Sequence, residues 1–147
     1  MSPAERLAAE LREAGVEAFT APDYRPGEVV HIVLFRFGAA VTEAERDTAK
    51  VRFLALGTEC RRAGEAYIRD VAAGEPNGGE GAERGFEQGF VLRFGSEGDR
   101  NFYVGTPVVS DPAHCDPAHH AFKMLVGPLL EPGPGGVLVF DIATGRP

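Results

Sequence analysis

The sequence has few of the features that mark membrane or secreted proteins. Its 147 residues include only two cysteines, Cys60 and Cys115, which are too few for a disulfide framework and favour a reducing compartment. No apolar run approaches the roughly 18 residues that span a bilayer, and the N-terminus lacks the basic and then apolar segments of a secretory signal. We therefore expect a cytoplasmic protein that does not engage a membrane.

Positive charge is also scarce. Lys and Arg number 15 against 22 Asp and Glu, so the formal net charge is −7. Nucleic acids are bound by clustered Lys and Arg, whereas the arginines of this chain are scattered, so we expect no nucleic-acid partner. Apolar residues, by contrast, make up 44% of the chain, which is enough for one globular domain with its own core.

Familiar motifs for phosphate binding and nucleophilic catalysis are missing as well. The glycine-rich segment 74–85 is acidic and lacks the residue order of a phosphate-binding loop, so we interpret it as a flexible connection. Ser96, Thr106 and Ser110 stand outside any Gly-x-Ser-x-Gly turn, which disfavours a hydrolase triad. Any chemistry must therefore rest on other residues.

Helix and strand signals indicate an α+β domain. Two capping boxes, at 2–5 and 42–45, predict helices that begin there; Gly15 closes the first, within a leading region of residues 2 to about 20, and the second runs to about Gly64. Strands and further helices are predicted at 29–37, 66–72, 86–94 and 136–142, and at 96–103 and 117–129. The first strand is apolar on both faces, so it should lie inside the sheet. Side chains expected to face the core from the second helix are Ala44, Val51, Leu54 and Ala55.

Three of the four histidines fall in the segment 111–120, which nearly duplicates an Asp-Pro-Ala-His unit. Asp followed by Pro begins a helix, so His119 should lie on a first helical turn. The helix dipole there favours a neutral imidazole, suited to accept a proton near pH 7. The same segment offers residue types that bind transition metals, although no established ligand spacing is present. These residues are His114, Cys115, Asp116, His119 and His120.

Five segments, in order along the chain, are similar to the stress-responsive dimeric α/β-barrel (Dabb) family. They are Val30–Phe37, Val41–Arg46, Gly85–Phe94, Pro117–Phe122 and Val137–Asp141. The resemblance implies a ferredoxin-like β-α-β-β-α-β monomer whose four-stranded antiparallel sheet packs against a second copy, giving a homodimeric barrel. It divides the chain into an extra N-terminal helix and linker, 1–27, and a barrel domain, 28–144.

The resemblance also implies a chemistry. A plant polyketide cyclase of this family closes its substrate by aldol condensation without metal or organic cofactor. Its proposed base matches His119, a tyrosine matches Tyr103 and a strand histidine matches His31, whereas a further histidine falls on Gln88. The chain departs from the cyclase in one more respect, since an insertion at 105–116 lies between Tyr103 and His119 in the sequence.

Elementary chemistry is consistent with these assignments. Removing a proton next to a carbonyl needs a neutral base and a donor for the enolate oxygen, so we predict catalytic roles for His119 and Tyr103. His31 shares strand parity with aromatic residues, which suggests an apolar pocket for a small carbonyl or aromatic ligand. Residues predicted to contact the ligand are His31, Phe35, Gln88, Phe90 and Phe122. No cofactor or metal is expected.

Three functions stay open at this point. The favoured one is a small-molecule-binding protein whose candidate activity is that of a cofactor-free cyclase or isomerase of the lyase type. The alternative is a non-catalytic oligomeric stress-response or structural protein, in which His31 and His119 are simply buried hydrogen-bonding residues. A lesser alternative is metal binding through segment 111–120.

Overall fold

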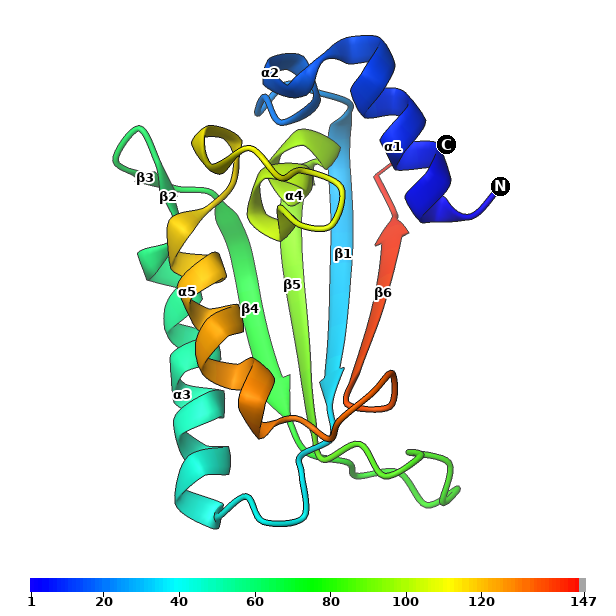
Figure 1. The fold of residues 1–147 in the computed structure, drawn as a ribbon, viewed down its shortest axis with the longest axis vertical. Helices are drawn as coiled ribbons and strands as arrows, with labels where there is room; N and C mark the ends of the chain where they lie inside the picture. Colours follow the sequence, from blue (N-terminus) through cyan, green and yellow to red (C-terminus); the bar gives the residue numbers. More distant parts are fainter. Residues whose placement is uncertain (146–147) are drawn as a thin grey trace.

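A single antiparallel sheet organises the chain in the computed structural model, which describes residues 1–145. Its strands are β1 (Pro26–Phe35), β4 (Ile68–Gly74), β5 (Gln88–Ser96) and β6 (Val137–Ala143), in the order β4-β5-β1-β6. Helices α3 (Glu43–Glu59) and α5 (Pro117–Val126) lie side by side over one face (Figure 1). This is the predicted ferredoxin-like fold, and β1 is an inner strand as expected.

The remaining elements lie outside the sheet and its two covering helices. They are α1 (Pro3–Ala14), α2 (Val16–Phe19), the hairpin strands β2 (Arg61–Arg62) and β3 (Glu65–Ala66), α4 (Glu97–Val104), and the 3₁₀ turns η1 (Pro112–His114) and η2 (Gly127–Leu129). Within residues 1–145 no helix is both long and apolar enough to cross a bilayer.

Both predicted capping boxes form. The Ser2 hydroxyl accepts a hydrogen bond from the backbone N–H of Glu5 at 3.2 Å, and the Glu5 carboxylate accepts one from the Ser2 N–H; Thr42 and Glu45 repeat the arrangement. Gly15, with φ of 83°, ends α1 as predicted, and the chain continues as the short helix α2, whose Phe19 is fully buried.

The rotation of α3 differs from the prediction. Its buried residues are Ala49, Phe53 and Leu56, whereas Val51 is 64% exposed. Apolar residues are spread around this helix, so their spacing does not indicate which face is buried. The packing of Phe53 determines the buried face, because its ring stacks on the Phe90 ring of β5 with 3.9 Å between centroids. The four residues expected to face the core are not among the buried ones: Ala44, Val51, Leu54 and Ala55.

The pairing of β1 with β6 gives the sheet two different faces. On the face that carries the helices, His31 lies opposite Asp141 and Val33 opposite Val139. On the other face, Ile32 lies opposite Phe140, which is 59% exposed. No element of residues 1–145 covers this second face, so it presents apolar side chains to solvent in the single chain.

Candidate active site

A cavity of about 420 Å³ lies between the helical face of the sheet and α5. Its volume is in the range of small-molecule sites. Most of its wall is apolar, including Val33, Phe35, Phe53, Phe122, Val126, Leu130 and Val139. The polar side chains in the wall are His31, Thr106, His119 and Lys123. An apolar cavity with a few polar groups suits a small molecule whose orientation these groups decide.

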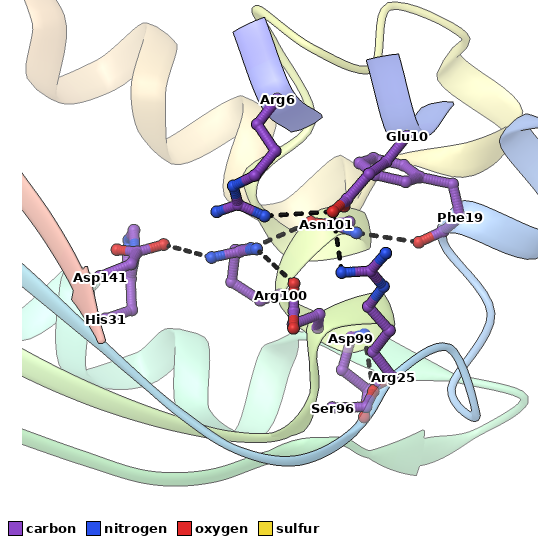
Figure 2. Close-up of polar contacts among 11 residues, drawn as sticks. Arg6, Glu10, Phe19, Arg25, His31, Ser96, Asp99, Arg100, Asn101 and Asp141 are labelled. Carbon is purple, nitrogen blue, oxygen red and sulfur yellow. Dashed lines mark hydrogen bonds and ion pairs between the residues drawn. The ribbon is translucent and has the colours of Figure 1, made fainter. Parts of the chain in front are cut away.

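His31 extends from β1 toward its register partner Asp141 on β6 (Figure 2). The distance between His31 Nδ1 and Asp141 Oδ1 is 2.6 Å, and Arg100 Nη1 donates to the other carboxylate oxygen, Oδ2, at 2.9 Å. Burial alone would raise the pKa of Asp141. The hydrogen bonds and charges of His31 and Arg100 outweigh burial and hold that pKa below its usual value. Asp141 is therefore ionised near pH 7 and holds one tautomer of His31.

Arg100 is itself held in place by its neighbours on α4. The residue is 7% exposed; its Nε donates to Asn101 Oδ1 at 3.0 Å, and Nη2 lies 3.7 Å from Glu97 Oε1. Asn101 in turn donates to the backbone carbonyl of Phe19 at 2.9 Å (Figure 2). The guanidinium beside Asp141 is thus tied to the N-terminal segment that precedes the sheet.

His119 lies on the first turn of α5, as predicted, and is 8% exposed. Asp116 caps this turn by accepting from the N–H groups of Ala118 and His119. The Nδ1 of His119 is 2.5 Å from the backbone carbonyl of Tyr103, so Nδ1 carries the proton and Nε2 the lone pair. Burial, and then the charge of Lys123, lower the pKa of His119 to about 3. This imidazole is neutral near pH 7 and is a weak proton acceptor.

The insertion at 105–116 does not separate Tyr103 from His119. Their rings stack with centroids 3.8 Å apart and an interplanar angle of 11°. Tyr103 is 1% exposed, and its hydroxyl has no hydrogen-bond partner among the described residues. Tyr103 does not line the 420 Å³ cavity but a neighbouring pocket of about 210 Å³. Its ring braces His119, while its predicted role as a donor to the ligand stays a prediction.

Two of the five predicted ligand contacts lie away from the cavity. Phe35, Phe122 and His31 line it, but Gln88 and Phe90 do not. Gln88 donates to the backbone carbonyl of Arg46 at 2.9 Å, and Phe90 stacks under Phe53. Strand alternation gives the correct face for both residues. It does not say which helix covers them, and α3 lies over this part of the sheet.

The metal-binding alternative gains no support from the arrangement of segment 111–120. Among residues 1–145 no three His, Cys, Asp or Glu side chains converge as a metal site requires. The Cys115 thiol donates a hydrogen bond to the Asp111 backbone carbonyl at 3.0 Å, and the Asp116 carboxylate accepts one from the Tyr67 hydroxyl at 2.5 Å. His114 Nδ1 lies 3.5 Å from the Thr20 hydroxyl.

Sequence reasoning missed three polar residues of the site: Arg100, Lys123 and Asp141. Alternation along β6 places Asp141 on the helical face, but its pairing with His31 depends on a register that the sequence does not state. Arg100 and Lys123 lie on helices as single charges without a recognisable motif. No local signal distinguishes them from solvated residues.

The family is decided by the match to a sequence profile. The profile of the stress responsive A/B barrel domain matches residues 29–144. The chain belongs to this Dabb family. The matched span begins after α1 and α2, so the N-terminal helices lie outside the family domain. No curated protein sequence is significantly similar to the chain.

Solved structures share the Dabb fold with this chain at low identity. The hydroxynitrile lyase from Passiflora edulis is 20% identical with a TM-score of 0.60, covering 83% of this chain and 99% of its own. The Arabidopsis thaliana protein At3g17210 is 21% identical with a TM-score of 0.59, covering 80% and 96%. A dimeric ferredoxin-like protein of unknown function from Jannaschia sp. CCS1 is 19% identical with a TM-score of 0.58, covering 79% and 98%. These likenesses establish the fold.

Proposed function

We propose that this Dabb protein binds a small carbonyl or aromatic ligand in the 420 Å³ cavity and acts as a cofactor-free cyclase or isomerase of the lyase type. One observation carries the proposal: an imidazole in the wall of an apolar cavity is paired with an ionised carboxylate at 2.6 Å. A histidine oriented in this way by a carboxylate is a common arrangement for general acid–base catalysis.

The chemistry follows from the tautomer of His31. Its Nδ1–H donates to Asp141, so Nε2 holds the lone pair and Asp141 stabilises the imidazolium that forms when Nε2 takes a proton. In an aldol closure, Nε2 removes a proton from the carbon next to a carbonyl and the C–H electron pair forms the enolate. The enolate carbon then adds to a second carbonyl carbon, and the proton returns to the new alkoxide oxygen.

This proposal moves the role of base from His119 to His31. A pKa of about 3 makes His119 a poor proton acceptor, whereas its Nε2 is a fixed hydrogen-bond acceptor that can orient a hydroxyl group of the ligand. The Passiflora edulis structure is that of a lyase, which is the reaction class proposed here. At 20% identity this supports the proposal only as a likeness of fold.

Enolisation tests the proposal directly. Benzylacetone carries an aromatic ring and protons next to a carbonyl, so exchange of these protons in deuterium oxide can be followed by proton NMR. We expect wild-type protein to accelerate the exchange, and Asp141→Asn to slow it by about 10²-fold or more because His31 loses its counter-charge. Asp47→Asn, an exposed aspartate of α3, is the matched control and should leave the rate unchanged.

The opposite result has a clear meaning. If wild-type protein exchanges these protons no faster than buffer, the proposed enolisation is wrong for this substrate class. If Asp141→Asn and Asp47→Asn behave alike, the His31–Asp141 pair is not the base, and the non-catalytic alternative becomes the better account.

We also infer that two copies of the chain assemble through the uncovered face of the sheet. Ile32 and Phe140 pair across β1 and β6 on this face, where Val30 and Leu34 lie opposite Ile142 and Leu138. Three fold neighbours are described as dimeric. A second copy would bury this apolar surface and complete the barrel that the family resemblance implies.

A further inference from the structure

One of the chain's two lysines, Lys123, lies in the wall of the cavity. It follows His119 by four residues on α5, so the two side chains lie one helical turn apart on the same face. The Lys123 Nζ donates to the backbone carbonyls of Val104 at 2.7 Å and Thr106 at 3.1 Å. Among the described residues no Asp or Glu forms an ion pair with it. Lys50, by comparison, faces Glu75 at the surface.

The contacts of Lys123 satisfy its hydrogen bonds but leave its charge unpaired. Backbone carbonyls are neutral acceptors, and the residues that line the cavity include no Asp or Glu. Burial lowers the pKa of Lys123, and the charge of Lys123 in turn lowers the pKa of His119. Lys123 is only half-buried, so its ammonium also reaches solvent; an anion in the cavity would nevertheless gain a charged hydrogen-bond donor that no carboxylate of the described residues occupies.

We propose that the cavity takes an apolar carboxylate, with Lys123 as the counter-charge of its single negative group. The inference rests on the proposed function only in placing the ligand in the same cavity. One ammonium balances one carboxylate, whereas a doubly charged phosphate would need further donors that this wall does not offer. The surrounding aromatic and aliphatic side chains suit an aryl or branched alkyl body.

A purely structural role for Lys123 is the competing explanation. Val104 is the last residue of α4, so an ammonium at its carbonyl also stabilises the end of that helix and fastens α5 to it. This role predicts a loss of stability when Lys123 is replaced. It predicts no preference between a charged and a neutral ligand of the same shape, and this difference separates the two explanations.

Hydrocinnamate and hydrocinnamamide form a suitable probe pair because they share one shape and differ in charge. Isothermal titration calorimetry at low salt should give about tenfold tighter binding of hydrocinnamate by wild-type protein, the size of effect typical of a partly buried ion pair. Lys123→Gln, which keeps donors for the two carbonyls, should abolish the preference and leave amide binding within about twofold. Lys50→Gln, the other lysine, is the control and should change neither affinity.

The comparison of the two probes with wild-type protein decides the charge preference even if Lys123→Gln unfolds. In that case Lys123→Arg, which keeps the charge, is measured in place of Lys123→Gln and should retain the preference. Equal binding of the two probes by wild-type protein overturns the inference and leaves the proposed enolisation intact. Loss of the preference in Lys50→Gln overturns the assignment to Lys123. If neither probe binds, the carboxylate inference fails, and benzylacetone exchange alone decides the proposed enolisation. A carboxylate preference without benzylacetone exchange upholds the inference alone.

Discussion

The two cavity histidines differ because their hydrogen-bond partners differ. The partner of His31 is a carboxylate that gains energy when the imidazole becomes charged, whereas the partner of His119 is a backbone carbonyl in a buried setting next to a lysine. Burial and the lysine charge both oppose protonation of His119, and the single carbonyl bond does not offset them. The same residue type is therefore paired with a carboxylate on β1 and held as a neutral group on α5.

This difference predicts a pH dependence of stability. His119 has a pKa of about 3 in the folded chain and about 6.5 when unfolded, so between these values the unfolded state binds more protons. The contribution of His119 to stability is thus complete above pH 6.5 and decreases as the pH falls, by at most about 1.4 kcal/mol per pH unit. The lowered pKa of Asp141 acts in the same direction, but only below about pH 4.

Urea unfolding of wild-type protein and His119→Gln between pH 7 and pH 4.5 measures this effect. We expect the free energy of unfolding of the wild type to decrease over this interval and that of His119→Gln to decrease less. His120→Gln, on the exposed side of α5, is the matched control and should follow the wild type. Parallel curves for wild type and His119→Gln would falsify the assignment of a low pKa to His119.

For single residues, the sequence predicts which side chains lie near the cavity more reliably than it predicts their hydrogen-bond partners. His31, Phe35, Phe122 and His119 line the cavity, and local signals point to part of this set: strand parity to His31 and Phe35, and an Asp-Pro helix start to His119. The sequence leaves open whether Tyr103 meets His119 across the 105–116 insertion; the stacking of the two rings and the direction of the Tyr103 hydroxyl both depend on packing. Asp141 is recognised as the partner of His31 only from the register of β1 with β6, which pairs residues 110 positions apart in the chain.

Among the elements, α4 shows how closely the N-terminal segment is fitted to the Dabb domain. The Gly98 N–H donates to the Tyr24 carbonyl at 3.0 Å, and a Cβ on Gly98 would lie 1.7 Å from the Ala21 carbonyl oxygen. That oxygen belongs to backbone, so it cannot rotate aside as a side chain would. The glycine is required because two chain segments meet here, not because of its own backbone angles.

Gly98→Ala should therefore destabilise the protein by roughly 3 kcal/mol, near the upper end of the cost of overpacking. Gly127→Ala is the control, because Gly127 has helical angles and a Cβ added there would meet no atom within 4 Å among the described residues. It should change stability by less than about 1 kcal/mol. Thermal and urea unfolding measure both. A Gly98→Ala protein as stable as Gly127→Ala would mean that residues 21–24 do not pack on α4 as described.

The contrast between helix existence and helix rotation also belongs to this scale. Capping boxes and strand alternation depend on neighbouring residues, so the helices at α1 and α3 and the core face of β5 were predicted. The rotation of α3 was predicted wrongly, because Val51 and Phe53 are both apolar and only the distant Phe90 ring decides between them.

For the molecule as a whole, the order of elements indicates a β-α-β-β-α-β outline, and the family resemblance adds the ferredoxin-like sheet. Each main strand and helix has its own local signal, and the connection rules leave few arrangements of a β-α-β-β-α-β chain. The single chain nevertheless leaves one face of its sheet without a covering layer among residues 1–145. An apolar sheet face of this kind calls for a second layer.

The last prediction concerns that second layer. Light scattering should give wild-type protein a mass near twice the 15.7 kDa of one chain. Phe140→Asp places a charge in the middle of the apolar face and should give the single-chain mass, because the charge loses its hydration when two sheets meet. Val51→Asp, on the exposed side of α3, is the control and should keep the wild-type mass. A dimer that survives Phe140→Asp and dissociates with Val51→Asp would place the contact on the helices. A single-chain mass for the wild type would leave the apolar face to a different partner.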